Sequence, residues 1–250
     1  MTHEPYGGFA GLYDQLMCAV DYQAWADYVE QLLSRYGSKT SSVIDLACGT
    51  GSSTIPFAER GYITAGVDIS GEMISKAQIK TSEKGLNITF HKQDLCNLSV
   101  PLKYGLAVLF QDGLNYITSE EKLRKAFNGI YDILTPGSLF IFDLTRPKLR
   151  PGSSQSTISW VDEKGFSMIW ESSYSMEKNL WSIKITVFEL AKGDLYKKYS
   201  EEHFEKDYDP GLVKELISDS GFKLLGLHPS FSLQEVTGSE AKLTFIAQKK

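Results

Sequence analysis

The stretch Asp45-Leu46-Ala47-Cys48-Gly49-Thr50-Gly51 decides the fold of this chain of 250 residues. It follows the apolar pair Val43-Ile44 and precedes a segment, 52–60, that we predict to be a helix. Small residues at positions 47, 49 and 51 let the backbone turn sharply and approach a ligand closely. In open α/β sheets, ligands bind at such turns between a strand and a helix. The stretch therefore predicts a ligand site at the end of a buried strand.

Strands and helices alternate on both sides of this turn. Apolar runs predict strands at 43–46, 63–67, 87–90, 106–110, 139–142, 222–227 and 243–247. Helical spacing predicts helices at 22–35, 52–60, 71–84, 119–134 and from 210 to 220. Apolar strands that alternate with helices indicate a parallel sheet covered on both faces. We therefore expect a Rossmann-like α/β fold with a seven-stranded, mostly parallel sheet.

Polar residues mark the predicted starts of these helices. Asp21, Ser70 and Asp209 each stand where a side chain can cap the first turn. Thr118 and Glu121 have the spacing of a capping box before the helix over 119–134. The boundaries of the helices thus have local chemical signals of their own.

The period of the apolar residues changes to two between about 155 and 206. Trp181, Ile183, Ile185 and Val187 alternate with polar residues, and turn residues separate such runs. This pattern predicts an antiparallel meander of three or four strands. We therefore divide the chain into one domain, made of 1–146 and 207–250, and an inserted antiparallel β segment, 147–206.

Composition argues against several classes of function. The net charge of −5 and the absence of any Lys/Arg block disfavour binding to nucleic acid. No apolar run reaches the roughly 18 residues of a membrane span, and no signal peptide begins the chain, so we expect no membrane partner and a cytoplasmic protein. The cysteines at 18, 48 and 96 lack zinc spacing, and we expect no metal.

From Ser42 to Phe110 the chain resembles the class I S-adenosylmethionine-dependent methyltransferases. Their first motif is an acid followed by glycines or alanine spaced by one, often with Cys-Gly in the middle, and 45–51 is similar to it. The resemblance implies that the backbone at Ala47, Cys48, Gly49 and Gly51 packs against the methionine moiety and ribose of the cofactor. It also implies that Asp45 lies near the cofactor's amino group.

Two further acids at predicted strand ends extend the resemblance. Asp68 ends the strand over 63–67 and is similar to the family acid that accepts both ribose hydroxyls, with Ile69 and Met73 flanking the adenine. Asp94 follows the strand over 87–90, where the family has an acid for the adenine amino group. The backbone amide of Leu95 would then donate to the adenine ring.

The residues after the strand over 106–110 line, by the same resemblance, the passage between the cofactor methyl group and the acceptor. Gln111 is assigned to the cofactor there. Asp112 is the first candidate to orient the acceptor or remove its proton, and Tyr116 is the second; alternatively, Asn115 and Tyr116 only cap the loop. His203 is either a base or, more simply, a solvent-facing strand residue. The Asn/Asp-Pro-Pro-Tyr and Pro-Cys motifs of enzymes that methylate nucleic acid or protein are absent, which favours a small-molecule acceptor.

The N-terminal segment Phe9 to Met17 is similar to a bacterial small-molecule subgroup that begins Phe-Ala-x-x-Tyr-Asp-x-Leu-Met. Proteins of that subgroup carry a β-meander after the fifth strand, so the resemblance implies that 147–206 is a substrate lid. It also places Tyr13 over the cofactor, where an aromatic face attracts a sulfonium. Alternatively, Phe9 and Tyr13 only form one apolar helix face.

Three of the four tryptophans, Trp160, Trp170 and Trp181, fall in the predicted meander. They either line an aromatic pocket for the acceptor or attach the small sheet to the main domain or to a second subunit. A homodimer is therefore one expectation.

The function that these motifs favour is in-line transfer of a methyl group from S-adenosylmethionine to a small molecule, with S-adenosylhomocysteine as product. Such a reaction needs mainly alignment of the reactants and exclusion of water. Two other classes remain open. A nicotinamide-dependent oxidoreductase is weakened because Thr54 stands where G-x-G-x-x-G requires a third glycine. A non-catalytic protein that binds the same cofactor would carry the same residues.

Overall fold

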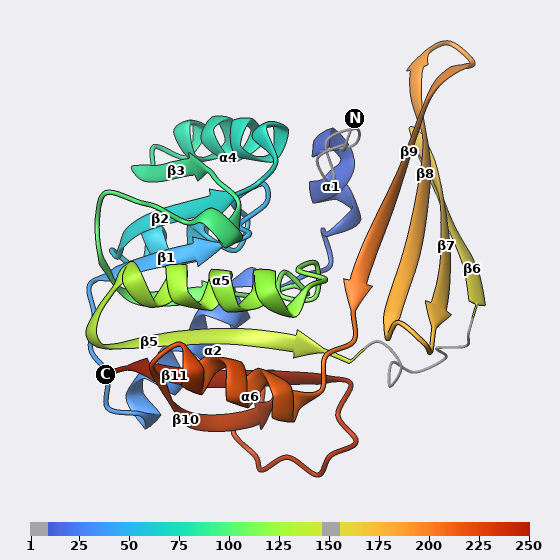
Figure 1. Cartoon of the computed structure of the whole chain (residues 1–250). Helices are drawn as coiled ribbons and strands as arrows, with labels where there is room; N and C mark the ends of the chain where they lie inside the picture. Colours follow the sequence, from blue (N-terminus) through green and yellow to red (C-terminus); the bar gives the residue numbers. More distant parts are fainter. Residues whose placement is uncertain (1–9, 147–155) are drawn as a thin grey trace.

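The computed structural model describes residues 10–146 and 156–250, which form two β-sheets that stand side by side (Figure 1). The larger sheet has seven strands in the order β10-β11-β5-β4-β1-β2-β3, and the smaller has four in the order β6-β7-β8-β9. The segments 1–9 and 147–155 lie outside the described residues, and with them Phe9 and the start of the predicted insertion.

The seven-stranded sheet has the predicted Rossmann-like arrangement. Five parallel strands come first along the chain: β1 (Ser42–Leu46), β2 (Ile63–Asp68), β3 (Ile88–Lys92), β4 (Tyr104–Leu109) and β5 (Leu134–Thr145). β11 (Lys242–Lys249) is antiparallel to β5 and to β10 (Phe222–Pro229). β11 is therefore the one reversed strand of this sheet, and the carboxyl ends of the five parallel strands meet at one edge.

Helices cover both faces of this sheet. They are α1 (Ala10–Leu16), α2 (Tyr22–Arg35), α3 (Ile55–Glu59), α4 (Gly71–Glu83), α5 (Glu120–Asp132) and α6 (Pro210–Asp219), with a short 3-10 helix, η1 (Leu95–Asn97). Phe127 of α5 and Val213 of α6 are buried in one hydrophobic core, and Leu32 of α2 and Phe57 of α3 in the other. In Figure 1, α5 and α6 lie in front of the sheet and α2 lies behind it.

The predicted caps at Asp21, Ser70 and Asp209 are confirmed. Each side chain accepts a hydrogen bond from a backbone amide of the first turn: Ala24 at 3.0 Å, Met73 at 3.3 Å and Gly211 at 2.8 Å, respectively. These bonds satisfy amides that have no partner within the helix.

Two predicted helix starts are wrong. Ser119, not Thr118, caps α5 and accepts from the Lys122 amide at 3.5 Å. α3 begins at Ile55 rather than at 52, because 51–54 form a turn in which the Ser53 and Thr54 hydroxyls donate to Asp45, both at 2.7 Å. These two bonds tie the turn to a buried acid.

The predicted meander is confirmed with four strands: β6 (Ser156–Glu163), β7 (Phe166–Ser175), β8 (Leu180–Lys192) and β9 (Leu195–Lys206). One face, which we call the inner face, packs Phe166, Ile183 and Val187 into a core that also includes Leu12 of α1. Trp181 is buried in that core, whereas Trp160 is 75% exposed on the opposite face. The three tryptophans of the meander therefore occupy different environments.

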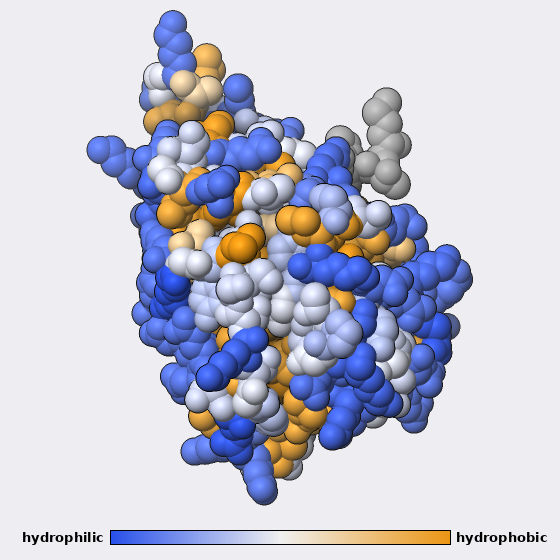
Figure 2. Space-filling model, turned by 90° about the vertical axis from the view of Figure 1, so that its left-hand side faces the viewer, coloured by the Kyte–Doolittle hydropathy of each residue, from blue (hydrophilic) through white to orange (hydrophobic). Residues whose placement is uncertain are grey.

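The side of the molecule away from the meander is largely hydrophilic. Figure 2 shows this side, on which hydrophobic residues lie in small groups between hydrophilic ones. Within 10–146 and 156–250, no helix is both long enough and apolar enough to cross a membrane. The cavities of interest lie at the opposite end, where the parallel strands finish.

Candidate active site

The loop after β1 depends on left-handed backbone conformations. Ala47, Gly49 and Gly51 have φ values of 55°, 53° and 78°. At Gly51 a Cβ would lie 3.1 Å from the Cβ of Ala77 and 3.2 Å from the Phe90 ring, so space as well as conformation requires glycine. The loop therefore packs closely against α4 and β3 at Gly51.

Asp45 fastens this loop from below. It is 2% exposed, and its carboxylate accepts the Ser53 and Thr54 hydroxyls described above. Burial raises the pKa of Asp45 to about 6; the two hydroxyl bonds lower it and the charge of Asp68 adds to the rise. Thr54, which stands where the dinucleotide-binding pattern has its third glycine, is fully buried, and its hydroxyl donates to Asp45.

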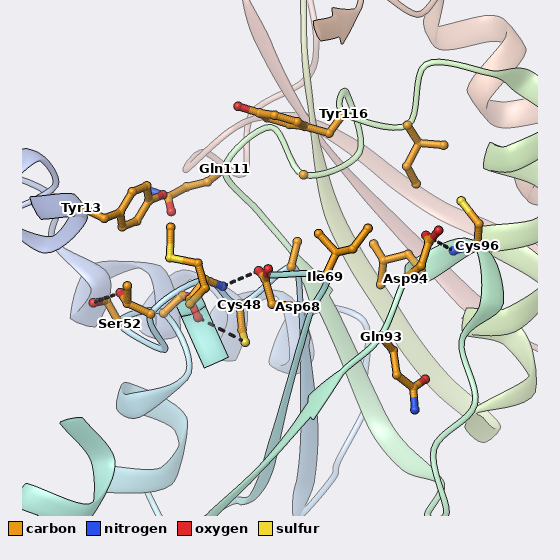
Figure 3. Close-up of a pocket in the computed structure, with 18 of the residues that line it drawn as sticks. Tyr13, Cys48, Ser52, Asp68, Ile69, Gln93, Asp94, Cys96, Gln111 and Tyr116 are labelled. Atoms are coloured by element: carbon orange, nitrogen blue, oxygen red, sulfur yellow. Dashed lines mark hydrogen bonds between the residues drawn. The ribbon is translucent and has the colours of Figure 1, made fainter. Parts of the chain in front are cut away.

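A cavity of about 260 Å³ opens above the loop, at the carboxyl ends of β1, β2, β3 and β4 (Figure 3). Most of the predicted cofactor residues line it: Tyr13, Ala47, Cys48, Gly49, Asp68, Ile69, Met73, Asp94, Leu95 and Gln111, together with Tyr116. Asp45, Gly51 and Asp112 are not among its lining residues. In Figure 3, Tyr13 and Gln111 lie at one end, Asp94 and Cys96 at the other, and Asp68 and Ile69 between them.

The two acids that line the cavity are held by backbone amides. Asp68 accepts from the amides of Gly49 and Ser70, each at 2.8 Å, so it joins the glycine loop to the start of α4. Asp94 accepts from the Cys96 amide at 2.9 Å and caps η1. Burial and, to a lesser extent, the charge of Asp94 raise the pKa of the Cys96 thiol to about 11, so this thiol stays protonated.

Several lining residues carry no clear sequence signal. Tyr22 comes from the start of α2, and its hydroxyl accepts from the Gln111 side chain at 3.4 Å. Gln93 lines the cavity, but its side chain bonds the backbone of Ser99 and points away from the other labelled residues in Figure 3. Thr50, Ser52, Ser53, Cys96, Gly113, Ile117, Thr118 and Lys122 complete the lining.

Gln111 and Asp112, after β4, are both held in the left-handed region, with φ of 58° and 63°. Asp143 of β5 is 1% exposed and accepts from the amides of Gln111 at 3.0 Å and Asp112 at 3.3 Å. Lys242 lies 3.1 Å from the carboxylates of both Asp112 and Asp143. A buried acid and a lysine from β11 thus stabilise a strained turn.

The charges of Asp112, Asp143 and Lys242 depend on one another. Burial raises the pKa of Asp143, and the ion pair with Lys242 opposes that rise. Burial alone would lower the pKa of Lys242, but the two carboxylates outweigh it and raise the pKa. Lys242 therefore stays charged and holds Asp112, whose carboxylate also accepts from Thr145.

A second cavity, of about 760 Å³, lies between the turn after β4 and the inner face of the meander. Its walls include Leu16 at the end of α1, Met17 after it, Trp25 of α2, Asp112 and Lys242, and the meander residues Phe166, Met168, Trp170, Ile185 and Glu205. Tyr13, Gln111 and Tyr116 line both cavities. The two spaces therefore adjoin at these three residues.

His203 is not the solvent-facing residue that the strand pattern favoured. It is 3% exposed and lies on the inner face of β9, where its ring packs edge-on to Tyr116 at 5.8 Å between centroids. Its Nε2 atom lies 3.2 Å from a carboxylate oxygen of Glu201. Alternation in a strand separates two faces but does not say which of them a neighbouring domain covers.

Fold and cavity together define a class I S-adenosylmethionine-dependent methyltransferase. The methyltransferase-domain family pattern matches residues 43–137. A putative methyltransferase of Bacillus subtilis (strain 168), YqeM, is 30% identical over 246 residues, which cover 98% of this chain and 97% of that protein. The chain therefore belongs to this methyltransferase family, and its cofactor is S-adenosylmethionine.

Two further similarities concern structure and substrate. The crystal structure of an S-adenosylmethionine-dependent methyltransferase from Clostridium acetobutylicum ATCC 824 is 28% identical, with a TM-score of 0.86 over 98% of both chains. A dTDP-3-amino-3,4,6-trideoxy-alpha-D-glucopyranose N,N-dimethyltransferase of Streptomyces venezuelae is 26% identical over 123 residues, 49% of this chain and 50% of that protein.

The residues that line the first cavity fit the cofactor chemically. Carboxylates at Asp68 and Asp94 suit hydroxyl and amino donors, and the apolar side chains of Ile69 and Met73 suit the faces of a purine. Ala47, Cys48 and Gly49 of the glycine loop line the same space.

Proposed function

We propose that this methyltransferase acts on a small organic molecule that binds in the second cavity. The observation that carries the proposal is the wall common to both cavities, formed by Tyr13, Gln111 and Tyr116. The bound cofactor supplies an activated methyl group. An acceptor atom held about 3 to 3.5 Å from that group, in line with the departing sulfur, would complete the transfer.

In this proposal the first cavity holds the cofactor with its adenine toward Asp94 and Leu95 and its methionine moiety toward the glycine loop. Asp68 accepts the ribose hydroxyls, and Ile69 and Met73 enclose the purine. Tyr13 lies over Gly49, 4.0 Å from the place of a Cβ, so its ring stands near the sulfonium. Asp45 and Gly51 act indirectly, by fixing the conformation of the loop.

Of the two candidate catalytic residues, Tyr116 has the more suitable position. It lines both cavities, whereas Asp112 lines only the second. Lys242 and Thr145 already bond the Asp112 carboxylate, which fixes it in place as an orienting group. We propose that Tyr116 contacts the acceptor beside the methyl group and that Asp112 orients it.

The meander, part of the segment 147–206, is proposed to be the substrate lid. Its inner face gives the second cavity aromatic and aliphatic walls at Phe166, Met168, Trp170 and Ile185, which exclude water and suit an organic acceptor. The Streptomyces relative is named for an amino-sugar nucleotide, which supports an acceptor of small-molecule size.

Two tryptophans on opposite faces of the meander provide a matched test. Turnover of labelled S-adenosylmethionine over a metabolite panel would first identify an acceptor. Trp170→Ala should then reduce turnover, with S-adenosylhomocysteine affinity within about twofold of wild type, because it removes a wall of the second cavity only. Trp160→Ala, at the exposed control position, should change neither. Full turnover in the Trp170 variant, or methylation of macromolecules alone, would contradict the proposal.

A further inference from the structure

Helix α1 forms part of the wall of both cavities. Tyr13 lines the two cavities, while Gln15 and Leu16 line only the second. Leu12, on the same helix, is 6% exposed and packs into the core of the meander's inner face. Figure 1 shows α1 between the seven-stranded sheet and the meander. A displacement of α1 would therefore change the cofactor site and the acceptor site together.

Asp14 attaches this helix to the glycine loop. One carboxylate oxygen accepts from the Thr50 hydroxyl at 2.5 Å and from the Ser52 hydroxyl at 3.2 Å. The other lies 2.5 Å from Nζ of Lys80, on α4. Lys80 in turn donates to Thr50 at 3.0 Å and to Ser52 at 2.9 Å, which closes the network.

Such a network matters because α1 is short. A helix of seven residues is not stable by itself in water, so contacts with its neighbours must fix its position. Charge-assisted bonds from Asp14 reach the loop that carries Gly49, and the adjacent residue, Tyr13, places its ring over that glycine. Tyr13 thus contacts the cofactor site, and the adjacent Asp14 holds Tyr13 in that position.

We propose that Asp14 is a positioning residue that seats α1 on the glycine loop and thereby couples occupancy of the two cavities. The inference rests on the proposed assignment of the first cavity to the cofactor and the second to the acceptor. Cofactor bound beneath Tyr13 stabilises the seated helix, and the seated helix completes the acceptor wall. Because coupling between sites is reciprocal, acceptor binding strengthens cofactor binding through the same helix.

The test compares two acids that each form an ion pair at 2.5 Å. Asp14→Asn removes the charge that faces Lys80, and Asp27→Asn removes a similar pair between α2 and Arg60, away from both cavities. Calorimetry should show S-adenosylhomocysteine binding about tenfold weaker in D14N and within about twofold of wild type in D27N. Hydrogen exchange of residues 10–17 should slow on binding in wild type and D27N, and less in D14N.

Further variants separate positioning from loss of fold. Lys80→Met removes the same network from the α4 side and should reproduce the tenfold loss. In a Tyr13→Ala background, D14N should add less than twofold, because the two residues act through one contact. Additive losses, or wild-type affinity and exchange in D14N, would overturn the inference. Asp68→Asn, whose carboxylate bonds the amides of Gly49 and Ser70, reports separately whether the first cavity binds the cofactor at all.

Discussion

Replacing Asp68 by asparagine should weaken S-adenosylhomocysteine binding by roughly 10- to 150-fold. In the proposed site the carboxylate accepts both ribose hydroxyls, and asparagine keeps one acceptor oxygen in the same shape. The variant therefore loses about one charge-assisted hydrogen bond, worth roughly 1.5 to 3 kcal/mol, and each 1.4 kcal/mol is about tenfold in affinity.

The same carboxylate also stabilises the empty protein. It accepts from the amides of Gly49 and Ser70 at 2.8 Å each, and asparagine can replace only one of these bonds. We expect the free energy of unfolding to fall by about 1 to 2 kcal/mol as well. Alanine would remove both bonds, so asparagine is the cleaner probe of the ligand.

The assay is titration calorimetry with S-adenosylhomocysteine, after circular dichroism has shown that the variant is folded. Asp219→Asn is a suitable control, since Asp219 pairs with Arg124 at 2.7 Å on an exposed surface. A dissociation constant for folded Asp68→Asn within twofold of the wild-type value would refute the assignment of Asp68 to the ribose.

Three other predictions concern the cofactor, the buried acid and the meander. S-adenosylhomocysteine should raise the melting temperature by binding the folded state, and NADH should not; a shift with NADH alone would contradict the cofactor. Burial raises the pKa of Asp45 from 3.8 to about 6. Between these pH values Asp45 is therefore mostly protonated in the folded chain and mostly ionised in the unfolded chain. Wild type should therefore lose about 2 kcal/mol of unfolding free energy, relative to Asp45→Asn, as pH rises from 4 to 6; equal urea-unfolding profiles would argue against this. A short Gly/Ser linker in place of 155–205 should abolish turnover but preserve S-adenosylhomocysteine binding, and a folded, fully active truncation would show that the meander is not the lid.

Much of the fold could be predicted because its signals are local. The apolar run before Asp45, the cap at Ser70 and the two-residue period around Ile183 each depend on neighbours in sequence. The errors arose where tertiary contacts decide between local options. Thr118 and Ser119 are adjacent hydroxyl residues that can both cap, and the sequence does not say which one does.

The candidate site divides in the same way. Asp68 and Asp94 could be placed together because parallel strands bring their carboxyl ends to one edge of the sheet. The partner of Asp112 could not be predicted, because Lys242 lies far along the chain on a strand that crosses back beside β5. The second cavity was also hidden, since α1, the turn after β4 and the meander each contribute only part of its wall.

The pairing of β5 with β11 has a consequence for how the protein is made. β5 lies inside the sheet, where Leu139, Phe140, Ile141 and Phe142 are fully buried, and β11 covers one of its edges along Leu139 to Thr145. A ribosome reaches β11 only after it has made the meander, α6 and β10. Until then the nascent chain exposes an unpaired, aromatic strand edge of the kind that aggregates. We therefore expect chains halted before Lys242 to require a chaperone to remain in solution.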